Sequence, residues 1–168
     1  MDVYYIFTGE RWKQIEENSF FLESTVEELK SYLELLCILS MALFKANILT
    51  ISSDNCKKIE HIRYALMPCK KGQTIFYKLR RALNYNQKKM AELMKVDVKK
   101  LRGMECGKIL PDSEIMYQML AVFSIPYALL LNDKNGLIGE INCLLGLMEE
   151  SKRKDVLEGM KFIHKTFC

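Results

Sequence analysis

Apolar residues in this chain recur at steps of three and four over long stretches. One series runs through residues 29–44, a second through 137–148 and a third through 156–167. A period near 3.6 residues places such side chains along one side of an α-helix. The pattern therefore predicts a mostly helical protein, and only 3 prolines and 8 glycines are available to interrupt the helices.

The chain is long enough to bury a substantial core. Its 168 residues are 49% hydrophobic and 27% charged, which excludes a disordered, collagen-like or low-complexity protein. We predict an all-α fold in three parts. An acidic helical domain spans residues 1–70, a compact helical domain spans 73–133, and a helical extension spans 134–168. Breaks at Met67–Gly72 and Asn132–Gly136 separate them.

The first part begins with an apolar stretch, Val3–Phe7, for which a short strand and an extended arm are both open. A short helix over Glu10–Asn18 is expected to carry Trp12 and Ile15 on its apolar side. A further helix is expected over Asp54–Leu66.

A longer helix is expected after residue 24. Ser24 or Thr25 can cap it, with Glu27 or Glu28 closing a capping box. The helix is apolar on more than one side, which predicts burial all round. Its uncharged run, residues 35–44, is much shorter than the roughly 20 residues of a membrane span, so we expect no membrane contact.

Charge is distributed unevenly along the chain. Residues 1–56 carry a net charge of −5, residues 57–108 carry +11 and residues 109–168 carry −2. The positive charges of residues 57–108 repel one another unless they are solvated or face an anion, and nucleic acid is the usual anionic partner of such a segment. On charge alone, a solvated surface and a nucleic-acid interface both stay open.

Helix start and stop signals follow each other closely inside this basic block. Asn86 and Asp97 are suitable N-caps, and Ala91 is small enough for two helices to cross closely. Gly107 can adopt the positive φ that ends a helix, and Pro111 precedes a new helix start. The pattern predicts a helix opened by residue 87 and a second from Val98 to about Glu105, packed together through Met90, Met94, Val96 and Leu101.

The segment Ile75–Asn132, about a third of the chain, resembles the Cro/cI-type helix-turn-helix domain of the phage-repressor-like family. The resemblance implies that the helix from Val98 is a DNA-recognition helix and that Gln87 reaches the DNA backbone. It also implies a partly buried ion pair between Arg80 and Glu105, and a dimer on two half-sites. The matching positions are Leu79-Arg80, Asn86–Asp97, Leu101, Met104–Lys108, Pro111, Ile115, Leu120-Ala121, Phe123–Ile125 and Leu129-Leu130.

The outward side of the expected recognition helix is basic. Lysines can pair with phosphates, and Arg102 can read a guanine edge through two hydrogen bonds. The chain departs from the family at Gly103, where a base-reading side chain is common, and at Lys95, where a turn glycine is usual. Besides Gln87, which the resemblance places on the DNA backbone, we expect six DNA-contacting cations to share one face: Lys88, Lys89, Lys99, Lys100, Arg102 and Lys108.

Two short amphipathic helices are expected after residue 136, because the two apolar series there are out of phase across Glu149–Lys154. Packing onto the chain's own domain and dimerisation are both open. We expect Leu137, Ile141, Leu144 and Met148 to be buried, either at a two-fold interface of a dimer or against the N-terminal helices.

No pattern indicates an enzyme, a cofactor or a metal site. The two histidines and the dispersed cysteines lack zinc-ligand spacing, and the glycines form no phosphate-binding loop. The N-terminal residues do not read as a signal peptide. We therefore expect free, mostly buried thiols and a cytoplasmic location.

Two functions are compatible with these features. The leading hypothesis is a transcriptional regulator of phage or mobile-element type that binds double-stranded DNA as a homodimer. The alternative is a protein-binding effector on the same scaffold, such as an anti-CRISPR-like inhibitor of a defence nuclease or an antitoxin. Such an effector would act through residues 1–70 and could also bind DNA to regulate its own expression.

Overall fold

A computed structural model describes residues 19–68 and 72–167. The expected strand or arm at Val3–Phe7 and the expected helix over Glu10–Asn18 lie outside the described residues. Helices make up 74% of the structure, and the described residues form no strand, so the all-α expectation is confirmed. The helices are α2 (Ser19–Glu23), α3 (Val26–Lys45), α4 (Ser53–Leu66), α5 (Ile75–Ala82), α6 (Gln87–Leu93), α7 (Val98–Glu105), α8 (Ser113–Phe123), α9 (Tyr127–Leu131), α10 (Lys134–Gly146) and α11 (Glu150–Phe167).

Local side-chain bonds fix the start of α3. The Thr25 hydroxyl accepts a hydrogen bond from the Glu28 amide at 3.2 Å, and the Glu28 carboxylate accepts one from the Thr25 amide at 2.5 Å. This reciprocal pair is a complete capping box. Ser24 is fully buried and donates to the Phe20 carbonyl instead. Thr25 is therefore the cap, and Ser24 ties α2 to the start of α3.

The expectation that α3 is buried on all sides is wrong. Leu33 and Leu36 are fully buried, whereas Leu35 is 40% exposed and Ile38 is 45% exposed. The buried side faces α4 and α10, which both pack against α3. No helix described in the structure covers the opposite side enough to bury these two residues, so part of the apolar surface of α3 faces solvent.

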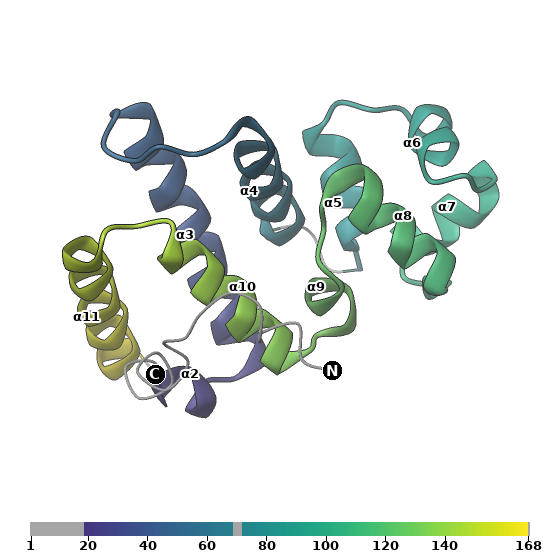
Figure 1. Cartoon of the computed structure of the whole chain (residues 1–168). Coiled ribbons are helices and arrows are strands. Elements are labelled where there is room, and N and C mark those ends of the chain that lie inside the picture. The colour runs from purple at the N-terminus through teal and green to yellow at the C-terminus, as the bar shows by residue number, and fades with distance from the viewer. Residues whose placement is uncertain (1–18, 69–71, 168) are drawn as a thin grey trace.

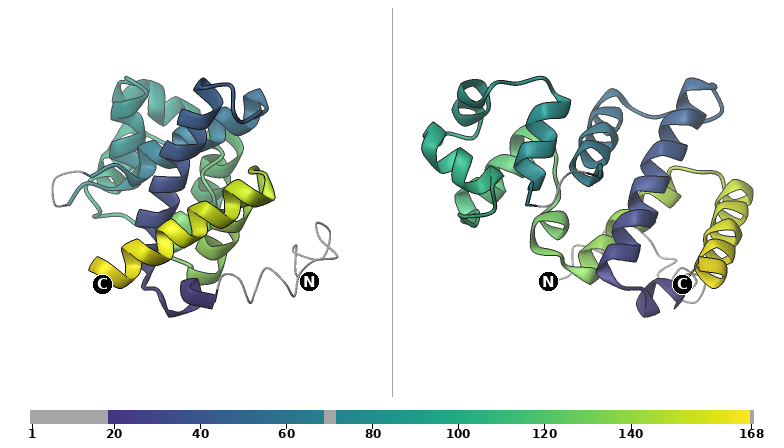
Figure 2. Two further views of the ribbon diagram at one scale, coloured as in Figure 1. Left: turned by 90° about the vertical axis from the view of Figure 1, so that its left-hand side faces the viewer. Right: turned by 180° about the vertical axis from the view of Figure 1, so that it is seen from behind.

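Helix α10 lies along α3 although the two are far apart in the sequence (Figures 1 and 2). Four residues considered for a dimer contact are buried on α10 or directly after it, with exposed fractions of 6% or less: Leu137, Ile141, Leu144 and Met148. They belong to the chain's own core. The prediction that these four residues are buried is confirmed, and the packing of α10 on α3 within one chain is the arrangement that the structure shows, so they offer no exposed surface to a second copy.

The expected turn over Asn132–Gly136 is shorter than its composition suggests. Asp133 caps α10 through hydrogen bonds from the amides of Asn135 and Gly136, so the helix has already begun at Lys134. A side chain at Gly136 would bring its Cβ to 2.7 Å from the Cβ of Ala128 in α9. Glycine is required there by close packing inside a helix, not by a turn.

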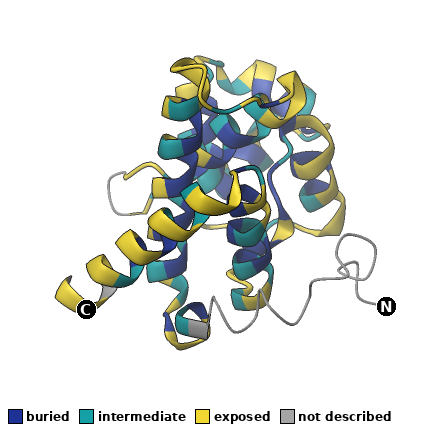
Figure 3. Ribbon diagram, turned by 60° about the vertical axis from the view of Figure 1, so that its left-hand side comes forward, coloured by how far each residue is buried: buried dark blue, intermediate teal, exposed yellow. Residues whose placement is uncertain are grey.

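The two amphipathic helices expected after residue 136 are confirmed as α10 and α11. The chain turns between them at residues 147–149. Among the α11 residues whose burial the structure describes, Leu157 and Met160 are buried, and most of the outer side of the helix is exposed (Figure 3).

The three expected parts pack against one another. Helix α4 packs on α5 across the expected break at Met67–Gly72. The ring Nδ1 of His61 in α4 lies 2.8 Å from the carbonyl oxygen of Phe123 at the end of α8. Lys58 in α4 forms an ion pair with Glu140 in α10 at 2.9 Å. Helices α5 to α9 thus project from a base made of α3, α4 and α10, as Figure 1 shows.

In the part of the chain that the structure describes, no helix has the length and apolar content needed to cross a bilayer.

Candidate nucleic-acid interface

Helices α6 and α7 lie together at one end of the molecule, opposite α11 (Figure 1). The Asn86 side chain accepts from the Lys89 amide at 2.8 Å, and the Asp97 side chain accepts from the Lys100 amide at 2.7 Å. Each cap satisfies an amide that has no partner inside its helix. Ala91 is 2% exposed, so the two helices meet closely. Three of the other residues expected to pack these helices together are also buried, namely Met90, Met94 and Leu101.

The link between the two helices contains a residue in a left-handed conformation. Lys95 has a φ of 55°, where a glycine would carry no steric cost. Its side chain is exposed, so the conformation of the backbone places a positive charge at the tip of the link. The departure from a turn glycine therefore adds a cation to the same end of the molecule.

Gly103 faces a neighbouring side chain instead of open solvent. A Cβ added at this position would lie 2.7 Å from the Cγ1 atom of Ile109. Ile109 is brought there because its amide and that of Lys108 both donate to the Gly103 carbonyl after Gly107 turns the chain at a φ of 69°. The glycine on the outer side of α7 has a packing reason, since Ile109 occupies the space where a larger side chain would project.

The Arg80 and Glu105 side chains form an ion pair that joins α5 to the end of α7. Arg80 is 8% exposed and Glu105 is 4% exposed. Arg80 Nε donates to Glu105 Oε1, and Nη2 donates to Oε2 at 3.2 Å. The third nitrogen, Nη1, donates to the Tyr85 carbonyl at 3.1 Å. The guanidinium is therefore hydrogen-bonded through all three of its nitrogens within the chain, as a buried cation needs to be.

Gln87 continues this network toward the surface. Its Nε2 donates to Glu105 Oε2 at 2.9 Å, and its Oε1 accepts from Arg102 Nε at 2.7 Å. The family resemblance implies that Gln87 reaches the DNA backbone, but here both of its polar atoms hold partners inside the chain. The sequence does not indicate this arrangement, because it requires the register of α6 against α7 to be known.

Four of the expected lysines project into solvent: Lys88, Lys89, Lys99 and Lys108. Arg102 is also exposed. Lys100 differs, because it is half-buried and forms an ion pair with Asp112 at 2.9 Å. The seven expected residues thus all lie on α6, on α7 or directly after α7, but Gln87, Lys100 and Arg102 are engaged in contacts within the chain.

Asp112 is a residue of this region that sequence reasoning did not assign to the site. Its carboxylate accepts from the Ile115 amide at 3.0 Å and from Lys100. The backbone bond from Ile115, followed by the Lys100 bond, lowers the pKa of Asp112 below its ordinary value. The carboxylate caps α8 and partly neutralises the basic surface next to it. Its position one residue after Pro111 identified it as a helix start, but gave no sign of the pair with Lys100.

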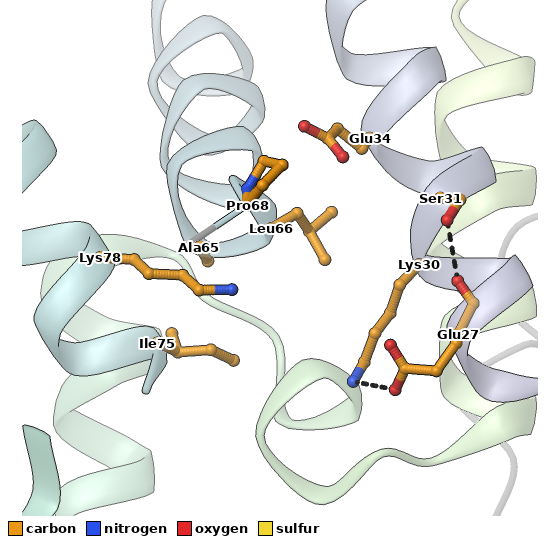
Figure 4. A pocket seen from close by; sticks show the side chains of 9 residues that line it. All are labelled: Glu27, Lys30, Ser31, Glu34, Ala65, Leu66, Pro68, Ile75 and Lys78. Atoms are coloured by element: carbon orange, nitrogen blue, oxygen red, sulfur yellow. Dashed lines mark hydrogen bonds and ion pairs between the residues drawn. The ribbon is translucent and has the colours of Figure 1, made fainter. Parts of the chain in front are cut away.

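A separate pocket of about 270 Å³ lies between α3, the end of α4 and the start of α5 (Figure 4). It contains Lys30, which pairs with Glu27 at 3.0 Å, and Ser31, whose hydroxyl donates to the Glu27 carbonyl. None of the residues that line it is a histidine or a cysteine, so no nucleophile–base pair of those types is assembled there. The other lining residues are Glu34, Ala65, Leu66, Pro68, Ile75 and Lys78.

The described residues contain no group of three or more His, Cys, Asp or Glu side chains that could hold a metal ion. Cys37 on α3 is fully buried, whereas Cys143 on α10 is exposed. Burial, and secondarily Glu140, raises the pKa of Cys37 to about 12, and partial desolvation raises the pKa of Cys143 as well. Both shifts favour the unreactive protonated thiol.

Comparison with protein-family models, with curated proteins and with solved structures gives no significant match for this chain. The site must therefore be interpreted from its own residues and geometry.

Proposed function

We propose that the protein binds double-stranded DNA through α6 and α7, which act as a helix-turn-helix of the Cro/cI type, and that it regulates transcription in the cytoplasm. The observation that carries the proposal is the gathering of exposed cations on, and directly after, two capped and closely crossing helices. Those cations are Lys88, Lys89, Lys99, Arg102 and Lys108.

The roles of these residues follow from the way a short helix enters the major groove. The exposed side of α7 faces the bases, while the start of α6 crosses the sugar–phosphate backbone. Lys88 and Lys89 in the first turn of α6 then pair with phosphates, and Lys99 does so from α7. Arg102 is the residue of α7 that reads a base, because a guanidinium matches the guanine edge.

A regulator of this type acts as a homodimer on two half-sites about 34 Å apart. The contact between the two copies cannot use the buried side of α10. The adjacent helices α8 and α9 carry exposed apolar side chains, chiefly Tyr117 and Leu131 at 58% and 59% exposure. We propose these helices for the two-fold contact.

The experiment compares two triple variants of equal charge change. The first is Lys99→Ala with Lys100→Ala and Arg102→Ala on α7. The matched control is Lys45→Ala with Lys57→Ala and Arg63→Ala, three exposed cations on α3 and α4. A preferred duplex is first selected from a random pool, and affinity is then measured by fluorescence anisotropy over a range of salt concentrations.

We expect the α7 variant to lose preferred binding and to flatten the slope of log affinity against log salt by about 0.9 for each phosphate that the protein no longer neutralises. The control should keep both the preference and the slope. Equal losses in the two variants would mean that net charge, not α7, attracts the DNA, and would contradict the proposal.

The alternative, a protein-binding effector, is favoured by one observation. Leu35 and Ile38 on α3 and Leu22 on α2 are exposed apolar side chains on the acidic N-terminal part of the chain. If biological activity survives in the α7 triple variant and is lost when Leu35 and Ile38 are changed to serine, the effector function is the primary one. Loss of activity together with DNA binding favours the regulator.

A further inference from the structure

We propose that Gln87 is a positioning residue for base recognition: it holds the Arg102 guanidinium so that its two terminal nitrogens face the DNA, and it does not serve as a phosphate contact. The inference rests on the proposed DNA-binding function and adds to it the residue that sets base preference. It also names guanine as the base that this arrangement suits.

The geometry begins at the buried ion pair. Glu105 is held by Arg80, so its Oε2 atom is a fixed acceptor near the start of α6. Gln87 Nε2 donates to that oxygen at 2.9 Å. An amide group with its nitrogen on a carboxylate must direct its oxygen the other way, and Gln87 Oε1 accordingly accepts from Arg102 Nε at 2.7 Å. The Gln87 amide thus bridges the Glu105 carboxylate and the Arg102 guanidinium. Both hydrogen bonds favour the same orientation of the amide, with its nitrogen toward Glu105 and its oxygen toward Arg102.

The hydrogen bond from Gln87 uses a particular part of Arg102. A guanidinium has five N–H donors, one on Nε and four on the terminal nitrogens. Since Nε is bonded to Gln87, the remaining four donors sit on Nη1 and Nη2 of an exposed side chain. These two nitrogens form a parallel pair that matches the O6 and N7 acceptors of guanine end-on. Holding Nε also limits the side-chain freedom that binding would otherwise remove.

The other residues on the outer side of α7 are less suited than Arg102 to contact a base. Gly103 has no side chain, and Ile109 fills the space beside it. Lys100 is drawn toward Asp112. Lys99 is exposed but carries a single ammonium, which suits a phosphate better than a base edge. The discrimination of this surface therefore depends on how Arg102 is aimed, and Gln87 is the side chain that aims it.

The test uses the full chain and two duplexes, the selected one and a copy in which the preferred guanine is replaced. Arg102→Ala should lower the affinity ratio of the two duplexes about 5- to 150-fold, which is the discrimination of one bidentate pair. Gln87→Met keeps the side-chain length and should lower the same ratio while leaving affinity for the replaced duplex unchanged. The double variant should equal Arg102→Ala alone.

Lys88→Met on the same turn of α6 is the control for a phosphate contact. It should weaken binding to both duplexes equally and reduce the salt slope by about 0.9. If Gln87→Met also weakens both duplexes equally, Gln87 contacts the backbone and the inference is overturned, whereas DNA binding stands. If the wild-type protein binds no duplex, the proposed function itself fails.

A measurement without DNA tests the Gln87–Arg102 hydrogen bond directly. The Nε–Hε signal of Arg102 in a ¹H–¹⁵N spectrum is assigned by its loss in Arg102→Ala. It should move in Gln87→Met and stay in place in Lys88→Met, with both variants folded by circular dichroism. A signal unchanged by Gln87→Met would show that the two side chains are not held together, and would overturn the inference.

Discussion

Arg80 and Glu105 illustrate how one buried ion pair serves both stability and position. Each charge alone would be costly in the interior, and each finds its partner there with good geometry. Because Glu105 also accepts from Gln87, the pair fixes the end of α7 against the start of α6. The proposed interface depends on how α6 and α7 are placed against each other, and charged hydrogen bonds help to set that placement.

Removing one partner of this pair should strongly destabilise the protein. Arg80→Met leaves Glu105 buried with only Gln87 as a donor, and we expect the free energy of unfolding to fall by about 3–5 kcal/mol. The control is Lys152→Met, which removes the exposed pair with Glu149 and should cost less than about 1 kcal/mol. Urea unfolding monitored by circular dichroism measures both. Similar small losses would show that the buried pair has little effect on stability.

Cys37 should make stability depend on pH in the alkaline range. Burial, with a smaller effect of Glu140, raises its pKa from the ordinary 9.0 to about 12. The unfolded chain therefore loses this proton first as the pH rises, and stability present below pH 9 is lost progressively toward pH 12. Between pH 9 and pH 10 the loss should be about 1 kcal/mol. The contribution of Cys37 is measured by comparing the pH dependence of the free energy of unfolding in wild type, in Cys37→Ala and in Cys106→Ala, where the altered thiol is exposed. Of the two variants, only Cys37→Ala should flatten this pH dependence.

At the scale of single elements, the sequence predicts helix starts well because capping is local. Asn86 and Asp97 each cap a helix through an amide three residues ahead, and no distant contact is needed. Thr25 also caps its helix through an amide three residues ahead, although the sequence left Ser24 and Thr25 as equal candidates and only the structure identifies Thr25 as the cap. Ser52 caps α4 through the Asn55 amide, so this helix begins at Ser53, one residue before the expected start at Asp54.

Which side of a helix is buried could not be predicted for α3. Leu35 and Ile38 are as apolar as Leu33 and Leu36, so composition gives no distinction between the two sides. The buried side of α3 is set by the packing of α10, a helix that lies far from α3 in the sequence. The hydrogen bond between Gln87 and Arg102 could not be predicted for a related reason, since it depends on how two helices are set against each other.

Two adjacent leucines in α3 test this orientation. Leu36 is fully buried and Leu35 is 40% exposed. Leu36→Ala should lower the free energy of unfolding by about 2–5 kcal/mol, because it leaves a cavity and also removes apolar packing. Leu35→Ala should cost less than about 1 kcal/mol, as expected for a partly exposed position. Chemical unfolding of the two variants under identical conditions is the measurement. A larger loss at Leu35 would reverse the assigned faces.

At the scale of the whole molecule, the ends of the described chain build one base for the α5–α9 region. Helices α3 and α10 pack along each other, and the Lys58–Glu140 pair joins α4 to the same assembly. The amphipathic pattern of residues 137–148 predicted a helix with one buried side, but it could not tell whether that side meets another part of the chain or a second copy. The sequence pattern is the same for both arrangements because both bury the same residues, and the structure shows the first of them, with α10 packed on α3.

Ile141 decides between those two arrangements in solution. It is fully buried on α10, which packs against α3, so Ile141→Ala should lower the free energy of unfolding by about 2–5 kcal/mol. Because the interface lies within one chain, the difference from wild type should not depend on protein concentration. An interface between two copies would instead give a loss that shrinks as concentration rises, together with a shift of the variant toward monomer. Thermal unfolding of both proteins over a hundredfold range of concentration, with light scattering for mass, separates the outcomes. A concentration-dependent difference would return residues 137–148 to the dimer interface and would contradict the packing of α10 on α3.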